Sequence, residues 1–139
     1  MANKYYFTWG VGYGSKILAE KNALRNAKIS SVDLTGLKKL EVPKGNVVEL
    51  KKQLKGKAKG IVLKKCVKGE AAVALFLGIT ADKIYIGKGM GRSLQKAVKK
   101  AESELKKKKI DFEGTQEIAS SAEAKKGEYS CAVVALLIK

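Results

Sequence analysis

Short apolar runs, separated by glycine, proline or lysine-rich stretches, dominate the pattern of hydrophobic and polar positions. Runs of this length that are rich in β-branched and aromatic residues favour strands. The last run, residues 129–138, is apolar on both faces, as expected of a central strand. The segment 117–124 is ambiguous. The predicted strands cover residues 5–9, 31–34, 47–50, 61–67, 71–80, 83–86, 110–112 and 129–138.

Two segments have helical character. Residues 16–28 follow Ser15, a plausible N-cap. In residues 92–108 one apolar stripe recurs at spacings of four, three and four, and we expect it to face a sheet. Its members are Leu94, Val98, Ala101 and Leu105. Together the elements predict a single α/β domain over residues 1–139, with strands layered against helices.

Each predicted helix follows a strand and a Gly-x-Gly-x-Gly sequence, at residues 10–14 and 87–91. The echo fits an internal duplication or two similar strand-to-helix turns. Phosphate-binding loops are a further reading, because backbone N–H groups at a helix start attract anions. Neither copy has the Gly-Lys-Ser/Thr of a Walker loop or the later acid of a dinucleotide fold. We therefore expect tight turns in which glycine adopts a positive φ.

The charge balance changes the picture most. Lys and Arg number 29 against 13 Asp and Glu, a net charge of +16. Such self-repulsion is relieved by a polyanion, with nucleic acid the first candidate and an anionic membrane surface the second. The alternative is a lysine-rich surface that only aids solubility. Only Arg25 and Arg92 can offer the bidentate fork that reads guanine, so phosphate contacts with little sequence reading are expected.

Lysines concentrate in two stretches. Residues 38–68 hold eleven lysines against two acids, and more lysines line the second predicted helix and its end. We expect the two stretches to lie on neighbouring elements and to form one positive face, the alternative being an even spread. The predicted nucleic-acid-binding residues are Lys51, Lys52, Lys55, Lys57, Lys59, Lys96, Lys99, Lys100, Lys106 and Lys107.

The sequence lacks the residues that most often act as general acids, general bases or activated nucleophiles. The chain has no histidine, and Glu102 and Glu104 point in different directions on a helix. Cys66 and Cys131 lie in apolar strand-like runs, which predicts buried free thiols and no metal site. No cofactor is implied. No apolar run is long enough to span a bilayer or to act as a signal peptide, so we expect a cytoplasmic protein that binds no membrane.

Several sequence segments together resemble the pyruvoyl-dependent arginine decarboxylases. Residues 68–75, Lys-Gly-Glu-Ala-Ala-Val-Ala-Leu, lie where that family has Pro-Gly-Glu and small or aliphatic residues. Residues 87–105 match its Glu-Gly-Lys and the following helix, and residues 127–139 resemble its closing Gly-Cys-Ala-Phe strand and final lysine. Residues 22–29, Asn-Ala-Leu-Arg-Asn-Ala-Lys-Ile, are similar to its Gly-Ala-Leu-Leu-Asn-Ala-Gly-Ile. The resemblance implies a layered α/β sandwich that assembles as a trimer.

The family's chemistry requires a Ser-Ser bond that cleaves itself to give a pyruvoyl group. Here Lys38-Lys39 occupies that position. Ile86 aligns with the catalytic glutamate and Lys21 with the substrate-binding aspartate. These replacements, together with the net charge, predict a non-catalytic homologue that binds a polyanion, with RNA or DNA, alone or in a ribonucleoprotein, as the first candidate.

Two other readings remain open. The chain is an enzyme with displaced cleavage serines, at Ser30-Ser31 or Ser120-Ser121, or it is an inactive subunit that pairs with an active decarboxylase.

Overall fold

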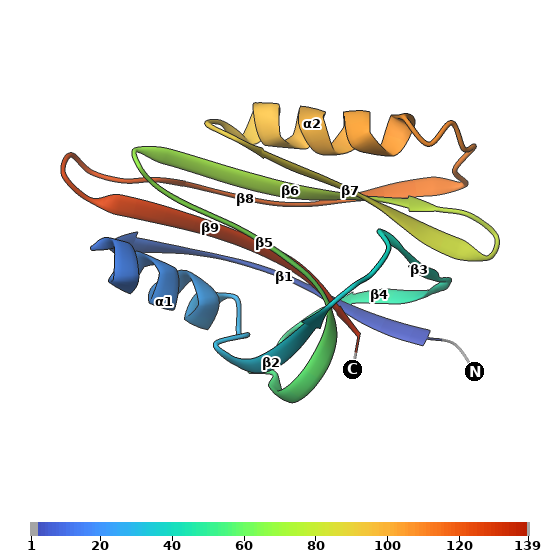
Figure 1. Cartoon of the computed structure of the whole chain (residues 1–139), viewed down its shortest axis with the longest axis horizontal. Helices are drawn as coiled ribbons and strands as arrows, with labels where there is room; N and C mark the ends of the chain where they lie inside the picture. The colour runs from blue at the N-terminus through green and yellow to red at the C-terminus, as the bar shows by residue number, and fades with distance from the viewer. Residues whose placement is uncertain (1–2, 139) are drawn as a thin grey trace.

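Two β-sheets lie face to face with one helix on the outer side of each, in a computed structural model that describes residues 3–138 (Figure 1). The mixed α/β class predicted from the sequence is therefore confirmed. The helices cover opposite faces of the molecule. The elements in chain order are β1 (Asn3–Gly14), α1 (Lys16–Asn26), β2 (Ser31–Gly36), β3 (Glu41–Pro43), β4 (Gly45–Glu49), β5 (Lys55–Lys68), β6 (Glu70–Ile79), β7 (Lys83–Gly91), α2 (Leu94–Lys106), β8 (Gly114–Glu123) and β9 (Tyr129–Ile138).

The chain passes between the sheets four times, twice around the short strand β3 and twice at longer strands. The first sheet has the strand order β2-β5-β9-β1-β4, and the second has the order β3-β7-β6-β8. The β5–β6 turn at Gly69, where φ is +103°, leads from the first sheet to the second, and the β8–β9 connection leads back. Helix α1 packs on β1 and β9, while α2 packs mainly on β7 and β6.

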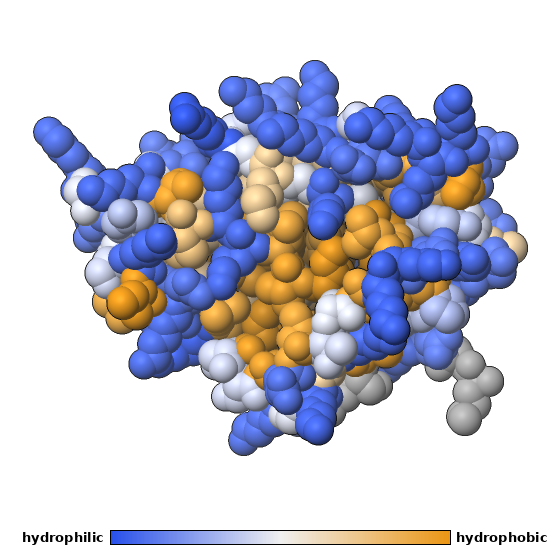
Figure 2. Space-filling model, in the orientation of Figure 1, coloured by the Kyte–Doolittle hydropathy of each residue, from blue (hydrophilic) through white to orange (hydrophobic). Residues whose placement is uncertain are grey.

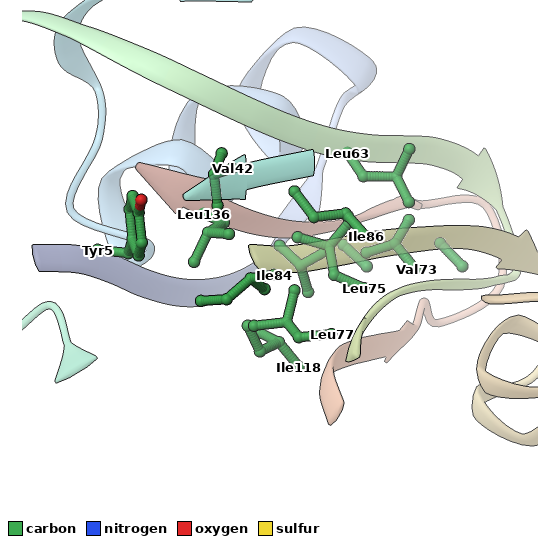
Figure 3. Packing of buried hydrophobic residues seen from close by; sticks show 13 residues of the cluster. Tyr5, Val42, Leu63, Val73, Leu75, Leu77, Ile84, Ile86, Ile118 and Leu136 are labelled. Atoms are coloured by element: carbon green, nitrogen blue, oxygen red, sulfur yellow. The ribbon is translucent and has the colours of Figure 1, made fainter. Parts of the chain in front are cut away.

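The main hydrophobic core fills the space between the two sheets (Figure 3). Leu63 of β5 and Leu136 of β9 come from the first sheet and meet Val73, Leu75 and other residues of the second. Because side chains alternate along a strand, each sheet places its other face against a helix. Two smaller clusters lie there, one under each helix.

The Gly-x-Gly-x-Gly segments lie inside strands and are not turns. A side chain at Gly10 would meet the carbonyl oxygen of Ala23 and the amide nitrogen of Ala27, each at 2.5 Å. A side chain at Gly89 would likewise collide with the carbonyl oxygen of Ala97. Of the six glycines in the two segments, Gly14 alone has a positive φ. The predicted positive-φ turns are therefore wrong, because these glycines serve the close approach of a helix to its strand.

The two strand–helix units share one construction. Ser15 and Ser93 both accept a hydrogen bond from the amide three residues on, so each helix has the same N-cap. Counted from these caps, Ala19, Ala23 and Ala27 of the first unit correspond to Ala97, Ala101 and Leu105 of the second. In each unit these residues line the glycine strand. The one difference in the connection is the extra Arg92 in the second unit.

The apolar stripe of the second helix differs from the prediction. The buried residues of α2 are Ala97, Ala101 and Leu105, while Leu94 remains 43% exposed. The reason is that the helix backbone packs directly on the glycines of β7, and only small side chains such as alanine fit between helix and strand. Larger apolar residues of the stripe lie to the side of this helix–strand contact.

Some strand bounds also differ from expectation. The predicted strand at 110–112 is absent from the described residues, and the ambiguous segment 117–124 lies largely in the ten-residue β8. Strand β5 begins at Lys55, so part of the expected lysine loop is a strand. The additional short strand β3 lies in the irregular part of the sequence.

The two cysteines are joined. Cys66 of β5 and Cys131 of β9 are direct partners in the antiparallel register, with their Cα atoms 4.1 Å apart, and they form a disulfide. The expectation of free thiols is wrong because it treated two apolar strands separately, and the sheet places them side by side. Disulfides persist mainly in oxidising compartments and in hyperthermophiles.

Candidate polyanion-binding surface

Helix α2 presents lysine on every side that does not face the sheet. Ala97, Ala101 and Leu105 point inward, and the helical period turns the residues between them outward. The five predicted lysines of this helix and its C-cap are all exposed, namely Lys96, Lys99, Lys100, Lys106 and Lys107. In Figure 2 hydrophilic side chains crowd the upper margin, where α2 lies in Figure 1.

Three of these lysines form a row beside the edge of β7. Lys96, Lys100 and Lys107 are separated by four and seven residues, which places them on one side of the helix. The row rises by about 16 Å, close to the axial rise of five base pairs of a duplex at about 3.4 Å each. Lys88 of β7 is exposed next to it. A groove of about 300 Å³ runs between helix and strand, lined by Lys88, Gly89, Met90, Lys100, Ser103, Glu104 and Lys107.

Few carboxylates neutralise this surface. Lys106 is paired with Glu102 at 3.2 Å and Lys107 with Glu104 at 4.0 Å, both in exposed pairs of the kind that contributes little. In the part of the chain that the structure describes, no acidic group lies within 4.0 Å of the ammonium groups of Lys88, Lys96, Lys99 or Lys100.

The start of α2 adds to the positive field. No acidic residue occupies the first turn, where carboxylates normally complement the helix dipole. Lys96 occupies the third position of that turn, and Arg92 precedes the cap. Cations at this end of a helix are unfavourable unless an anion is near. The local charge arrangement therefore favours an external anion at the N-terminal end of the row.

The second group of predicted lysines lies in the other layer of the molecule. Lys51 and Lys52 precede β5, and Lys55, Lys57 and Lys59 lie on the part of β5 that pairs with β2. Strand β5 belongs to the first sheet, whereas α2 covers the second sheet on its far side (Figure 1). The expected single face is therefore wrong, since the two lysine groups occupy separate surfaces.

Lys88 was missed by the sequence analysis. The sequence had indicated a turn at this residue. The pattern that indicates a strand instead is the alternation in residues 83–91, where glycines on one face alternate with larger residues on the other. Read as a strand, that pattern attaches Lys88 to the face of β7 away from α2, with Ile86 and Met90. Its exposed side chain nevertheless lines the groove beside α2.

The positions that the sequence resemblance assigns to a catalytic glutamate and a substrate-binding aspartate carry Ile86 and Lys21. Ile86 is fully buried in the apolar core between the sheets. Its amide donates to the carbonyl of Leu40 at 2.9 Å, so the Lys38-Lys39 loop lies next to it. Lys21 is on α1, in the opposite outer layer. The Tyr5 phenol donates to the carbonyl of Pro43, and burial raises its pKa, which keeps it protonated.

The serine pairs are in regular structure. Ser30 accepts a hydrogen bond from the side chain of Gln53 at 3.1 Å, directly before β2. Ser120 lies inside β8 and donates to the carbonyl of Gly10 at 3.2 Å. Both hydroxyls thus have partners that hold them in place.

Metal binding and membrane spanning find no support in residues 3–138. No cluster of three or more Cys, Asp or Glu side chains is arranged to hold a metal ion. Neither α1 nor α2 is long and apolar enough to cross a membrane.

Comparison of the sequence with known proteins does not assign the chain to a family. No protein-family model matches the chain, and a search of curated proteins gives no significant match.

Proposed function

We propose that the chain is a non-catalytic protein that binds nucleic acid through the surface of α2. The observation that carries the proposal is the row of exposed lysines along α2 and Lys88, most of them without a carboxylate within 4.0 Å. A phosphate backbone supplies the missing negative charge along the length of the row. Because lysine is a point charge, binding of this kind positions the backbone and reads little sequence.

Two structural features support the proposed relation to the pyruvoyl-dependent arginine decarboxylases: the order of helix and sheet layers, and the proximity of two aligned positions. Helices on both outer sides of two packed sheets suit the layered sandwich implied by the sequence resemblance. The hydrogen bond between Ile86 and Leu40 brings two of the aligned catalytic positions together. We infer a degenerate relative whose lysine loop and buried isoleucine replace the cleavage serines and the acid.

A homotrimer is part of the same proposal. Figure 2 exposes a hydrophobic area in the middle of the view, over the edge of the sandwich between the sheets. Partly buried side chains around the inter-sheet core, such as Leu37, Leu40, Ile61 and Met90, give such an edge its apolar character. An exposed apolar patch of this kind commonly marks a protein interface. Association with an active decarboxylase would use the same edge.

Two variants with the same charge change test the binding surface. The first replaces Lys96, Lys99, Lys100 and Lys107 by Gln; the second replaces Lys51, Lys52, Lys57 and Lys59. A single-stranded 20-nucleotide RNA and a duplex DNA of the same length serve as probes, and fluorescence anisotropy gives Kd over a range of salt concentrations. For RNA, losing four phosphate contacts lowers the slope of log affinity against log salt by about 3.

We expect the α2 variant to lose at least tenfold in affinity and to show the reduced slope, while the second variant binds nearly as the parent does. Equal losses in both variants would mean that net charge alone matters, and the α2 surface would be wrong. Salt-independent binding by the parent would contradict the electrostatic mechanism.

A further inference from the structure

The outer face of the first sheet is only partly covered. Helix α1 lies over β1 and β9, at one side of the five-stranded sheet, and touches β5 only slightly. Strands β5 and β2 therefore have no helix on this face. In Figure 2 a hydrophobic area is also exposed over α1, at the left of the view.

A continuous groove follows the uncovered flank of α1. A cleft of about 480 Å³ runs along the helix, lined by Ile17, Glu20, Lys21, Leu24, Arg25 and Ser30. A smaller cleft of about 190 Å³ adjoins it and shares Leu24 and Ser30. The floor of this second cleft is apolar, and it includes Val32, Leu34 and Val62. Ile17 at the rim is 82% exposed.

The second strand–helix unit shows that the fold does not require these apolar residues. Counted from the N-caps, Ile17 corresponds to Gln95 and Leu24 corresponds to Glu102. Two apolar positions of the α1 flank are thus polar in α2, while Glu20 of α1 corresponds to the partly buried Val98 of α2. A flank that only meets solvent needs no isoleucine, so the apolar residues of α1 point to a partner.

The strands beside the two helices differ in the same way. Ala119 of β8 packs under α2, and the residues that share its face are polar, among them Glu117 and Ser121. Beside α1 the corresponding face carries Val32 and Val62. The outer strands are therefore apolar beside the α1 groove, whereas the outer strand β8 beside α2 is mostly polar.

The rim of the groove is cationic. Glu20 is held by Lys64 of β5 at 2.6 Å, which leaves it little charge to offer. Within the described residues, no carboxylate lies within 4.0 Å of the charged groups of Lys21 or Arg25. An occupant with an apolar stripe and flanking carboxylates would complement both the floor and the rim.

The uncovered strip has the dimensions of one helix. Two strands at about 4.8 Å spacing give a width of about 10 Å, which equals the diameter of an α-helix with short side chains. Alongside, α1 has 11 residues and extends about 16 Å. We propose that this groove binds an acidic amphipathic helix of a partner protein, whose residues at i, i+3 or i+4, and i+7 contact Leu24 and the strands while its carboxylates meet Lys21 and Arg25.

A displayed library of helical peptides with randomised positions tests the proposal. We expect enrichment of Leu or Ile at helical spacing with Asp or Glu beside them. I17Q/L24E, which installs the residues of the second unit, should weaken the selected peptides at least tenfold. The control variant is L94K, in which an exposed leucine of α2 is replaced by lysine, the residue at the corresponding position of α1. It should bind the selected peptides as tightly as the parent chain does.

A second variant keeps the apolar groove intact. In K21E/R25E the enriched flanking residues should change from Asp and Glu to Lys and Arg. Peptides without helical spacing, or equal binding to I17Q/L24E, would overturn the proposal. So would light scattering that shows a wild-type oligomer dissociated by I17Q/L24E, since the groove would then bind another copy of this chain.

Discussion

Glycine at the helix–strand contacts is a steric requirement. A side chain at Gly89 would meet the carbonyl oxygen of Ala97 and lie 2.6 Å from the amide nitrogen of Ala101. Both are backbone atoms of α2, so relief requires the helix to move away from the sheet. That movement would open gaps along the whole contact, in an interior that is otherwise closely packed.

We therefore predict that Gly89→Ala lowers the free energy of unfolding by about 1–3 kcal/mol, the usual range for overpacking. Urea denaturation followed by circular dichroism gives the value. Gly36→Ala is the matched control, because a side chain there would have no neighbour within 4 Å. We expect its effect to stay within about 0.5 kcal/mol, as for surface substitutions in general. Similar losses in the two variants would refute the steric explanation.

At the scale of elements, most strands and both helices follow from hydrophobic patterning. Residues 129–138 are apolar on both faces and form the central strand β9, as the pattern indicates. Patterning failed where tertiary contacts decided the outcome. Gly10 and Gly87 look like turn residues in sequence, yet a packed helix explains their presence in strands.

The candidate surface was predictable in part, for a similar reason. Helical period places Lys96, Lys99 and Lys100 on the solvent side of α2 without knowledge of the fold. Whether Lys51 and Lys57 join them depends on which sheet each element enters. Local patterns carry no information on that choice, because β5 and β7 have similar sequence character but belong to different sheets.

The disulfide fastens two elements far apart in the chain. Cys66 and Cys131 are 65 residues apart in sequence, and they join neighbouring strands β5 and β9. Closing a loop of this length restricts the unfolded chain by about 4 kcal/mol in the chain-entropy description. We expect C66A/C131A to lose stability of that order in urea denaturation under oxidising conditions.

Reductant supplies the control for this prediction. Dithiothreitol should destabilise the parent chain by a comparable amount and leave C66A/C131A unchanged, because that variant has no bond to reduce. A parent chain that titrates with two free thiols in the absence of reductant would show that the strands are not cross-linked.

For the whole molecule, the charge is divided by layers. One lysine group lies on α2, outside the second sheet, and another lies at the start of β5 in the first sheet. The groove beside α1 has its floor on β2 and β5, the two strands whose paired part also carries the second lysine group. The α2 surface lies on the opposite outer layer, so the proposed nucleic acid and the proposed partner helix would not compete for one surface.

The state of the whole chain gives the last prediction. Pyruvoyl formation requires a serine hydroxyl to attack its own preceding carbonyl, and the aligned loop carries Lys38 and Lys39. In the two Ser-Ser pairs the attacking hydroxyl would belong to Ser31 or Ser121, and both residues lie in regular strands, β2 and β8. Ile86 offers no acid in any case.

Intact mass spectrometry should therefore show one uncleaved chain of 139 residues, and labelled arginine should release no more carbon dioxide than a control without protein. Two fragments that end at a Ser-Ser bond, one of them blocked by a pyruvoyl group, would restore the enzymatic reading and remove the non-catalytic one.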